Sequence, residues 1–464
     1  MTTEPRCAAL IMAAGKSTRM KSAVPKAAHP MCGKPVVRHI VDACIDAGIE
    51  RIIVVVGYEA EVVKSAAGDC AVYVTQDEQL GTGHAVKIAR EAIGDADYLA
   101  VFPADTPLIR PDTIRKMLDS CIQEKTAATL LSALIDESAM YGRIVRDNTG
   151  KRVLGIVEAK DALPDVLAIN EICTSIYAFD TAALLPALEE LRSENRQKEY
   201  YLTDVIGIFV KQGLVVEAYI ADDSSEALGI NNRVELASAT SEMRKRIAEN
   251  HMLNGVTIVD PATTYIDVGV EIGADTTLYP NTILERWTRI GAGCVIGPNS
   301  HIISSVIQDG AIVNSSVVED SDIGQGARVG PFSRIRPQSN IGQSAKIGNF
   351  VEIKKSIIGE KVSLGHLTYV GDSEIGARTN IGAGTITCNY DGKNKHRTKI
   401  GSDAFIGSNT VLNAPVEVGD GAFTGSGSVI TKDIPADALG LSRSELVIKE
   451  GWAKRRRERQ SEAG

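Results

Sequence analysis

A six-residue hydrophobic period runs through the second half of the chain. Neither an α-helix, with 3.6 residues per turn, nor an amphipathic strand, with a period of two, produces it. It is typical of hexapeptide repeats, in which each hexad forms one short strand and one corner of a parallel β-helix. The period recurs over 323–353 and over 400–430, where Thr424 interrupts the aliphatics. Its clearest run consists of branched aliphatics: Ile266, Ile272, Leu278, Leu284, Ile290, Ile296 and Ile302.

The repeat predicts a β-helix over 253–434, with one aliphatic of each hexad pointing into a narrow interior. Small residues such as Gly273 and Gly291 would let the chain turn at the corners. The period slips at 302–306, 318–323 and 353–358, and residues 388–399 read as an insertion. Residues 435–464 lose the repeat and end in a basic segment, WAKRRRER, which we interpret as solvated.

The first half of the chain alternates apolar runs with helical patterns. Buried strands are expected at 8–13, 51–56, 98–102 and 215–219, and helices at 36–47 and 85–92. This alternation predicts an α/β domain over 1–232, with an open, mostly parallel sheet whose ligand site lies at the carboxyl ends of the strands. Residues 233–252 would form a connecting helix, because 233–250 holds many good helix formers and neither Gly nor Pro.

Composition narrows the range of functions. A chain of 464 residues is too long for one core, so more than one domain is expected. The formal net charge of −9 argues against general affinity for nucleic acid or an anionic membrane. Eight scattered cysteines without a CxxC pair read as free thiols in a reducing compartment, which predicts a cytoplasmic protein. The apolar run 7–14 is too short to span a bilayer.

The first candidate site follows the strand at 8–13, which runs directly into the segment AGKSTRM. Its small residues let backbone N–H groups approach a phosphate, and Lys16, Arg19 and Lys26 supply positive charge. A P-loop is excluded, because that motif needs glycine five residues before Gly15, where Leu10 stands. A plain helix cap after a strand would leave a similar pattern.

Two further stretches strengthen the phosphate interpretation. The segment QLGTGH at 79–84 is a second small-residue turn that leads into a helical pattern. Asp105 follows a buried strand at the expected mouth of the sheet, where a carboxylate could hold Mg²⁺. The alternative for Asp105 is that it only caps the following turn.

The second candidate site lies on the repeat, between 333 and 396. Arg336 and Lys354 are 18 residues apart, which is about one coil of a hexapeptide β-helix, so they should stack on one face. Stacked cations repel unless an anion such as a sugar phosphate lies between them; the alternative is a solvated basic edge. His366 lies among these polar residues and could act as the base for N-acetylation, although the slip at 353–358 leaves its face uncertain.

These motifs together resemble the nucleotide-sugar pyrophosphorylases. With the hexapeptide region behind them, nearly the whole chain is similar to a bacterial bifunctional family that joins an N-acetylglucosamine-1-phosphate uridyltransferase to a glucosamine-1-phosphate N-acetyltransferase. The resemblance implies a Rossmann-like nucleotidyltransferase domain of GT-A type and a left-handed parallel β-helix. It also implies a homotrimer formed through the β-helix, with 388–399 and the tail beyond 435 reaching an adjacent subunit. No nucleic-acid or membrane partner is implied.

The implied reactions form UDP-N-acetylglucosamine, the precursor for cell-wall peptidoglycan and lipopolysaccharide. Acetyl-CoA first acetylates glucosamine-1-phosphate. UTP and Mg²⁺ then serve uridylyl transfer to N-acetylglucosamine-1-phosphate, with release of pyrophosphate. A sugar-1-phosphate oxygen is already an anion, so this second step needs charge neutralisation rather than a general base.

The resemblance assigns roles to individual residues. In the first site Arg19 and Lys26 would be catalytic, and Asp105 and Asn231 would bind the metal. His84 is interpreted as structural. The nucleotide and the sugar would contact Met12, Ala13, Ala14, Gly15, Lys26, Gln76, Gly81, Thr82, Asp105, Gly142, Glu158, Cys173 and Asn231.

In the second site His366 would be the catalytic base. The sugar phosphate would contact Arg336, Lys354, Tyr369, Asn380 and Lys395. Acetyl-CoA would contact Ala383, Asn389, Tyr390, Ser408, Ser426 and Arg443.

Three positions of the first site depart from the family pattern. Ser17 and Ala104 stand where glycine is usual, and Cys173 replaces the asparagine of a Glu-x-Asn-x-Gly motif. A thiol is a weak hydrogen-bonding group, so the lost contact could cost about 1 kcal/mol. An alternative is therefore an acetyltransferase alone, with a first domain that is inactive or uses another sugar-1-phosphate. A non-enzymatic scaffold and sensor is a third hypothesis, against which the His366, Arg336 and Lys354 set argues.

Overall fold

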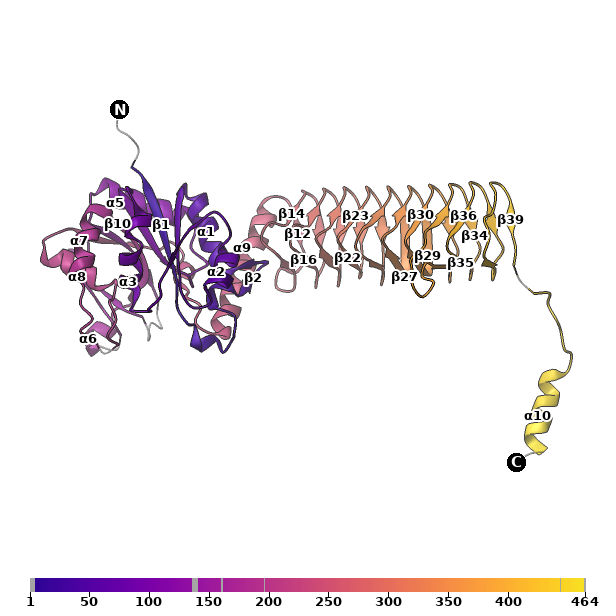
Figure 1. Cartoon of the computed structure of the whole chain (residues 1–464), viewed down its shortest axis with the longest axis horizontal. Helices are drawn as coiled ribbons and strands as arrows, with labels where there is room; N and C mark the ends of the chain where they lie inside the picture. Colours follow the sequence, from indigo (N-terminus) through magenta and orange to yellow (C-terminus); the bar gives the residue numbers. More distant parts are fainter. Residues whose placement is uncertain (1–4, 136–140, 160–161, 196, 443, 463–464) are drawn as a thin grey trace. The chain divides into compact units, whose positions relative to one another are not determined.

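The computed structural model describes residues 5–135, 141–159, 162–195, 197–442 and 444–462, and it divides into two compact units (Figure 1). The units are Met1–Arg246 and Ile247–Gly464, so the division falls within the long helix α9 (Arg233–Leu253). The connecting helix predicted over 233–252 is therefore present and ends at Leu253. Nothing in its sequence, such as a glycine or proline, stops it earlier.

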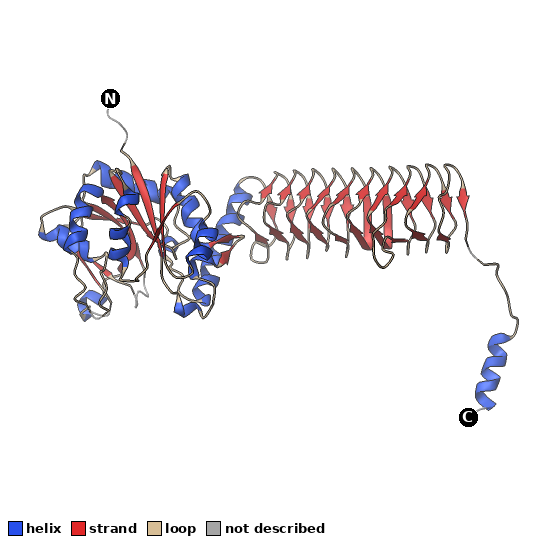
Figure 2. Ribbon diagram, in the orientation of Figure 1, coloured by secondary structure: helices blue, strands red, loops and turns tan. Residues whose placement is uncertain are grey.

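The first unit is built on a mixed sheet with helices on both faces (Figure 2). Strand β10 is antiparallel to both of its neighbours, whereas the other strands along the main path pair in parallel. The strand order is β11 (Val216–Ile220), β7 (Ala128–Leu134), β10 (Glu171–Asp180), β6 (Tyr98–Pro103), β1 (Cys7–Ala13), β4 (Arg51–Val56) and β5 (Val72–Thr75). A hairpin of β8 (Arg143–Arg146) and β9 (Val153–Val157) joins β10 at one end. The four predicted strands are confirmed to within one residue at each end.

Two apolar layers sandwich this sheet, because alternate residues of each strand point to opposite faces. Ala8 and Leu10 of β1 enter one layer, and Ala9 and Ile11 enter the other. The first layer contains α3 (Thr82–Ile88), α4 (Arg90–Ile93), α7 (Thr181–Glu190) and α8 (Asp204–Lys211). The second layer contains α1 (Val36–Asp46), α2 (Ala60–Ala67) and α5 (Pro111–Gln123). Helical structure over 85–92 is confirmed with one interruption: the backbone leaves the helical range at Ala89, with φ −83° and ψ 3°, which separates α3 from α4.

The second unit is the predicted parallel β-helix (Figure 2). Over most of its length, each short strand pairs in parallel with the third strand after it, so three strands make one coil. Where two strands are long, as β27 (Lys346–Lys354) and β29 (Ser363–Gly371) are, the partner is the second strand after. The strands run from β12 (Thr257–Ile258) to β39 (Leu439–Gly440). One face is here called sheet D. Its strands, in order, are β14 (Glu271–Ile272), β17 (Arg289–Ile290), β20 (Val306–Ile307), β23 (Ser321–Ile323), β26 (Ser339–Ile341), β28 (Ile357–Ile358), β30 (Ser373–Ile375), β33 (Thr398–Ile400) and β36 (Val416–Val418).

The aliphatic column of the repeat fills the interior. Leu278, Leu284, Ile296 and Ile302 have no solvent exposure, whereas Ile272, in the first coil, is only partly buried. Glycine at the corners has a steric cause. A Cβ added to Gly273 would lie 2.6 Å from the backbone nitrogen of Ala292 in the next coil, closer than any side chain can approach.

The predicted slips change the length of individual coils. Thr277 pairs with Val295 across a full coil, whereas Arg289 pairs with Val306 across a coil that is one residue shorter. The slip at 353–358 leaves another shortened coil, across which Asn340 pairs with Ile357. The insertion has the opposite effect, because it lengthens the coil across which Ser373 pairs with Thr398.

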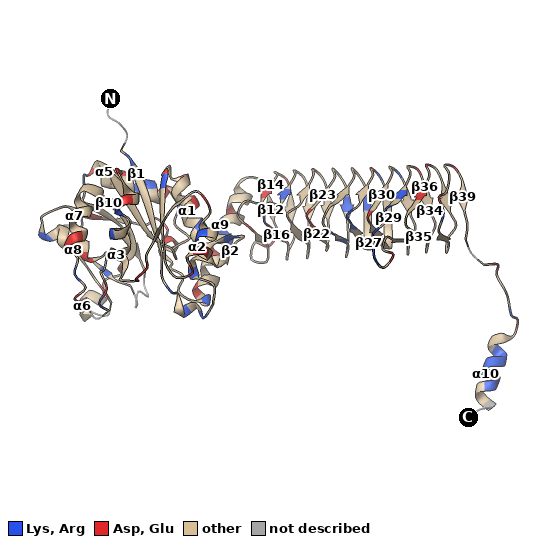
Figure 3. Ribbon diagram, in the orientation of Figure 1, with Lys and Arg blue, Asp and Glu red and all other residues tan. Residues whose placement is uncertain are grey.

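Other sequence expectations concern the cysteines and the tail. All eight cysteines are free thiols, as predicted. In the tail, α10 (Trp452–Glu462) carries a dense set of Lys and Arg (Figure 3), and its described residues are exposed. Among the described residues, we find no helix with both the length and the apolar character that crossing a membrane requires.

Candidate active sites

The first site is a cavity of about 280 Å³ at the carboxyl edge of the sheet in the first unit. Strands β1 and β6 are parallel neighbours, so the loops that follow them open at the same edge. Six of the predicted nucleotide, catalytic and metal residues line this cavity: Met12, Ala13, Gly15, Arg19, Lys26 and Asp105. Ala14 is buried beside them.

Charged groups converge at one end of this cavity. Lys26 Nζ forms an ion pair with Asp105 Oδ2 and lies 3.3 Å from Asn231 Oδ1. Arg19 Nη2 donates to the same Asn231 oxygen at 2.8 Å. The Lys26 and Asp105 side chains keep 18% and 19% of their exposure, so the pair is partly shielded from water. Asp105 and Asn231, which lie far from the phosphate loop in sequence, thus contact two of its cations, Lys26 and Arg19.

The backbone holds both proposed metal ligands in place. Ile230 donates its N–H to the Asp105 carbonyl at 2.8 Å, which ties the loop after β6 to the segment before α9. Glu235 accepts from the Asn231 N–H at 2.7 Å, and the Asn232 side chain accepts from the Glu235 N–H at 3.0 Å. Asn232 thus caps α9 much as in a capping box, except that the Glu235 carboxylate accepts from the residue before the cap. The sequence analysis missed Glu235, although Asn-x-x-Glu before a long helix is the signal that could have found it.

The backbone explains two departures from the family pattern. Ser17 has φ 52° and ψ 38°, the left-handed region that glycine enters without cost, which accounts for the usual glycine there. A non-glycine residue costs about 1–2 kcal/mol in that region. The Ser17 hydroxyl also accepts from the Lys26 N–H at 3.3 Å, so the replacement adds a contact within the phosphate loop. Ala104 is buried and has no positive φ, so its methyl group fits.

The second small-residue turn is fixed by close contacts. Gly81 has φ 108°, and a Cβ there would lie 2.6 Å from the Tyr200 carbonyl oxygen. Gln76 is only 4% exposed, and its Nε2 donates to the Gly81 carbonyl at 3.2 Å and to His84 Nδ1 at 3.0 Å. Thr82 Oγ1 accepts from the Leu202 N–H at 3.0 Å. His84 therefore has the structural contact that its interpretation requires.

The predicted sugar-binding residues form a second cluster. The Cys173 N–H donates to the Gly142 carbonyl at 2.9 Å, and a Cβ on Gly142 would lie 3.6 Å from Glu158 Oε1. Cys173 is 5% exposed, and burial raises its pKa to about 11, so it is a neutral thiol. Its Sγ lies 3.6 Å from the hydroxyl of buried Tyr177. Ser175 has φ 61°, which explains the glycine usual in this motif.

The second site is set by the register of the β-helix. Ile335 pairs with Ile353, and Arg336 donates its N–H to the Ile353 carbonyl at 2.8 Å, which aligns Arg336 with Lys354 on successive coils. The close approach of the Lys395 ammonium, partial loss of hydration and the charge of Arg336 lower the pKa of Lys354. Three predicted phosphate-binding cations therefore converge. Arg336 Nη1 also donates to Glu352 Oε1 at 2.8 Å.

His366 lies one coil above Asn349 rather than above Lys354. In the pairing of β27 (Lys346–Lys354) with β29 (Ser363–Gly371), Asn349 faces His366 and Lys354 faces Gly371. His366 Nδ1 is 2.5 Å from Asn349 Oδ1. An amide oxygen only accepts, so Nδ1 carries the proton and the Nε2 lone pair is left to act as a base. Asn349 was not assigned a role from sequence; its position one shortened coil before His366 is the missed signal.

The insertion is a hairpin that presents Lys395. Asp391 accepts from the N–H groups of Lys393 at 2.8 Å and Asn394 at 2.6 Å, and from His396 Nε2 at 2.6 Å. These hydrogen bonds hold the pKa of Asp391 well below its usual range. Tyr390 pairs across the hairpin with Lys395, and its hydroxyl donates to the Gly392 carbonyl at 2.6 Å.

Five predicted acetyl-CoA residues flank one column of stacked strands, which includes β32 (Ile386–Cys388), β35 (Val411–Asn413) and β38 (Val429–Ile430). Before these strands, the backbone N–H of Asn409 donates to the Ala383 carbonyl at 2.7 Å, and that of Gly427 donates to the Ser408 carbonyl at 2.8 Å. Ala383, Ser408 and Ser426 therefore occupy the same corner on successive coils. After β32, Asn389 Nδ2 donates to Asp372 Oδ2 at 2.5 Å. Asn380 lies on β31 (Asn380–Ile381), beside Ser363 of β29. Arg443 lies outside the described residues.

Asn389 and Tyr369 crowd the backbone at Gly371. A Cβ there would lie 2.5 Å from the Tyr369 hydroxyl and 2.8 Å from Asn389 Nδ2. Glycine at 371 therefore lets a sugar-site residue and an acetyl-CoA residue lie close together.

An apolar column lies at the corner beside His366. Phe332, Phe350 and Leu367 are 62%, 55% and 61% exposed, and the two phenylalanine rings stack at 5.7 Å. All three have positive φ, of 61°, 58° and 48°, in a corner position that Asn281 and Asn299 occupy earlier in the chain. Bulky residues rarely adopt this conformation, and exposed apolar clusters are uncommon on monomers.

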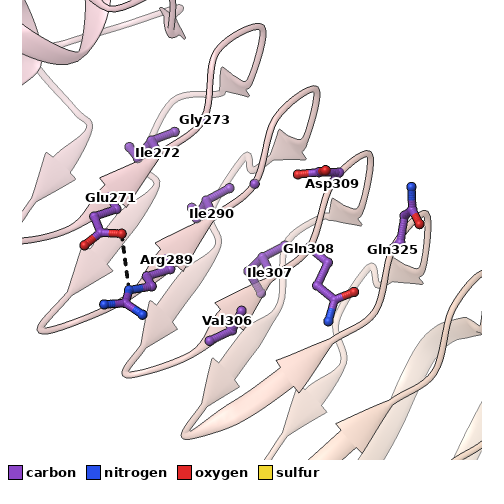
Figure 4. Close-up of a pocket in the computed structure, with 11 residues that line it drawn as sticks. Glu271, Ile272, Gly273, Arg289, Ile290, Val306, Ile307, Gln308, Asp309 and Gln325 are labelled. Carbon is purple, nitrogen blue, oxygen red and sulfur yellow. Dashed lines mark ion pairs between the residues drawn. The ribbon is translucent and has the colours of Figure 1, made fainter.

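A groove of about 630 Å³ on sheet D is lined by none of the residues predicted to bind substrate, metal or acetyl-CoA (Figure 4). Its charged side chains include Glu271 and Arg289, whose Oε2 and Nε are 3.2 Å apart. It has no nucleophile and no cluster of cations, so we assign no site to it.

Comparison with known proteins places both halves of the chain. A profile of the MobA-like NTP transferase domain matches residues 9–203. A profile of the GlmU-like C-terminal hexapeptide matches 297–380, and one of the bacterial transferase hexapeptide matches 269–304 and 397–432.

Whole-length relatives are similar as well. The bifunctional protein GlmU of Geobacillus sp. (strain WCH70) is 49% identical over 96% of this chain and 97% of its own length. That of Exiguobacterium sp. (strain ATCC BAA-1283 / AT1b) is 48% identical over 96% of this chain and 99% of its own. That of Clostridioides difficile (strain 630) is 45% identical over 98% of this chain and 99% of its own length.

Proposed function

The chain belongs to the bifunctional GlmU family, and from this premise we propose that its two units carry the two reactions at the sites described above. It is a uridyltransferase and acetyltransferase that makes UDP-N-acetylglucosamine, with UTP and acetyl-CoA as co-substrates. The observation that carries the residue assignment is the convergence of separate cations in each unit: Arg19 and Lys26 in one, and Arg336, Lys354 and Lys395 in the other.

In the first site, the task is to bring a sugar-1-phosphate oxygen onto the α-phosphate of UTP. Arg19 and Lys26 lie where they can neutralise the triphosphate, and the same two positive charges would stabilise the departing pyrophosphate. Gly15 and its neighbours leave backbone N–H groups open to phosphate. The Cys173, Gly142 and Glu158 cluster would contact the sugar.

Asp105 and Asn231 fit a magnesium site. A carboxylate and an amide oxygen are the hard donors that Mg²⁺ prefers, and this ion commonly uses one or two carboxylates plus substrate phosphates. Within the ranges that the structure describes there is no cluster of three or more His, Cys, Asp or Glu that could hold a metal by itself, which agrees with a site completed by phosphate. When bound, Mg²⁺ would supply positive charge to the phosphates.

In the second site, Arg336, Lys354 and Lys395 would bind the phosphate of glucosamine-1-phosphate, and Tyr369 and Asn380 its sugar. His366 would accept a proton from the amine as it attacks the acetyl carbonyl carbon, so that the thiolate of CoA departs and the amide forms. Asn349 orients the imidazole, because it holds the Nδ1 proton and leaves Nε2 unprotonated.

We propose a homotrimer through the β-helix. The exposed column of Phe332, Phe350 and Leu367 lies beside His366 and would be covered by a second copy. The predicted acetyl-CoA residues flank a column of stacked strands, with Ala383, Ser408 and Ser426 on one side and Asn389 and Tyr390 on the other, and a site shared between copies would use both sides. We propose the cytoplasm as the location, where UTP and acetyl-CoA are available and free thiols persist.

The two assignments can be tested separately in one protein. Pyrophosphate release is measured with UTP and Mg²⁺ and with N-acetylglucosamine-1-phosphate, glucosamine-1-phosphate or glucose-1-phosphate, and thiol release from acetyl-CoA is measured with glucosamine-1-phosphate. Asp105→Ala should abolish pyrophosphate release and spare acetyl transfer, and His366→Ala should do the reverse. His301→Ala is the matched control, as another histidine of the β-helix. Acetyl transfer that survives His366→Ala would contradict the proposed base.

The trimer is tested by sedimentation velocity. Phe332→Ser with Phe350→Ser should lower the assembled mass and acetyl transfer together, while pyrophosphate release continues. Ile357→Ser, at a residue of sheet D that is 50% exposed, is the control. A mass that does not change in the double variant would contradict this interface.

A further inference from the structure

Lys26 contacts both oxygens that the proposed function assigns to the metal. Its ammonium forms an ion pair with Asp105 Oδ2 and lies 3.3 Å from Asn231 Oδ1. The two contacts join residues 79 and 205 positions away in the chain, so they arise only from the fold. The inference below rests on the proposed function, because it takes Asp105 and Asn231 as the metal ligands.

A divalent ion and this ammonium cannot share the site. Mg²⁺ binds oxygen at about 2.1 Å, so an ion held by both oxygens would lie close to the space that Nζ now fills. Both groups are cations, and their repulsion is strong where water is partly excluded. The Lys26 and Asp105 side chains keep only 18% and 19% of their exposure. Occupation by one therefore requires displacement of the other.

Charge decides when that displacement takes place. Asp105 brings one negative charge, whereas Lys26 and Arg19 bring two positive charges, and Arg19 also occupies the Asn231 oxygen at 2.8 Å. The Glu235 carboxylate, which accepts from the Asn231 N–H at 2.7 Å, brings the local sum to zero, so a free divalent cation meets carboxylates whose charge is already compensated. A triphosphate offers Lys26 and Arg19 stronger partners, because cation–phosphate hydrogen bonds are charge-assisted at several oxygens. Their departure frees both ligand oxygens.

We propose that Lys26 is a stand-in cation that keeps the metal site closed until a triphosphate arrives. The divalent ion then enters with the nucleotide rather than before it. Lys26 consequently acts twice: it neutralises Asp105 first and the triphosphate afterwards. This arrangement would keep the partly buried carboxylate compensated at every stage of binding.

The test measures Mn²⁺ binding to the full chain in the absence of nucleotide. Electron paramagnetic resonance detects the bound ion. Lys26→Met removes the charge and keeps the length, and it should tighten Mn²⁺ binding by about tenfold or more, because a charge-assisted contact no longer competes. Lys26→Arg should leave Mn²⁺ binding as weak as in the native chain. Lys21→Met is the matched control, because Lys21 is an exposed cation of the same segment to which no role is assigned, and it should have no effect.

Mn²⁺ binding that is no tighter in Lys26→Met than in the native chain would overturn the proposal. A second variant separates this failure from failure of the proposed function. Asp105→Asn added to Lys26→Met should abolish the tightened binding if Asp105 is a metal ligand. Tightened binding that survives Asp105→Asn would show that the ion binds elsewhere, and both the metal assignment and the stand-in role would then be wrong. Unchanged acetyl transfer confirms in each case that the second unit is folded.

Discussion

The contact between His366 Nδ1 and Asn349 Oδ1 predicts that Asn349→Ala slows acetyl transfer. Without the amide oxygen, the imidazole proton is no longer held on Nδ1, and the productive tautomer and ring orientation are populated less. A hydrogen bond between neutral groups contributes about 0.5–1.5 kcal/mol, so kcat/KM should fall by about 2- to 12-fold. His366→Ala should cost far more, about 10²- to 10⁴-fold, because it removes the base itself.

A double-mutant cycle separates orientation from any independent role. Thiol release from acetyl-CoA is followed for each single variant and for the double variant at varied glucosamine-1-phosphate. If Asn349 acts only through His366, the double variant should be no slower than His366→Ala alone. Uridylyl transfer by the same preparation is the internal control, and Asn340→Ala, at an exposed asparagine of sheet D, is the matched variant. Losses that add in the double variant, or a native rate in Asn349→Ala, would refute the reasoning.

Three further predictions concern the first unit. Gly81→Ala should destabilise this unit by about 1–3 kcal/mol in urea and raise the KM for UTP, because φ is 108° and the new Cβ would lie 2.6 Å from the Tyr200 oxygen; an unchanged midpoint would contradict the clash. Cys173→Asn should raise kcat/KM for N-acetylglucosamine-1-phosphate by about fivefold, because one added hydrogen bond contributes about 1 kcal/mol. A decrease would show that the pocket fits the thiol better than the amide. Burial opposes ionisation of Asp223, but hydrogen bonds from Ser225 and two arginine charges outweigh it and lower its pKa to about 2, below the ordinary 3.8. The stability it contributes is thus present above pH 4 and lost as pH falls towards 2, and Asp223→Asn should remove that part of the pH dependence of unfolding.

The β-helix could be predicted from sequence almost completely. Each inward position is set by its own hexad, so Leu278 and Ile296 could be placed in the core without knowledge of distant residues. The slips were also visible, because a missing residue breaks a strict period. What could not be placed was the face of His366, since the shortened coil shifts it opposite Asn349.

In the first site, too, some features could be predicted from the sequence and others could not. The phosphate loop was readable because its small and cationic residues are adjacent in the chain and follow a buried strand. Helical structure over 85–92 was predicted, but its interruption was not, because hydrophobic spacing does not report the backbone angles at Ala89. Glu235 was missed although its Asn-x-x-Glu spacing is a local signal, whereas the Lys26 ion pair was missed because its partner lies 79 positions away in the chain.

The repeat, the α/β alternation and the types of residue available for chemistry can be read from the sequence, since all of these depend on neighbours along the chain. Which of those residues come into contact depends on the three-dimensional fold. Lys26 reaches Asp105 and Asn231 because two parallel strands and the start of α9 end at one edge of a sheet. Asn349 reaches His366 because one coil has a particular length. Local pattern fixes the elements, whereas contacts between distant residues depend on how the whole chain closes on itself.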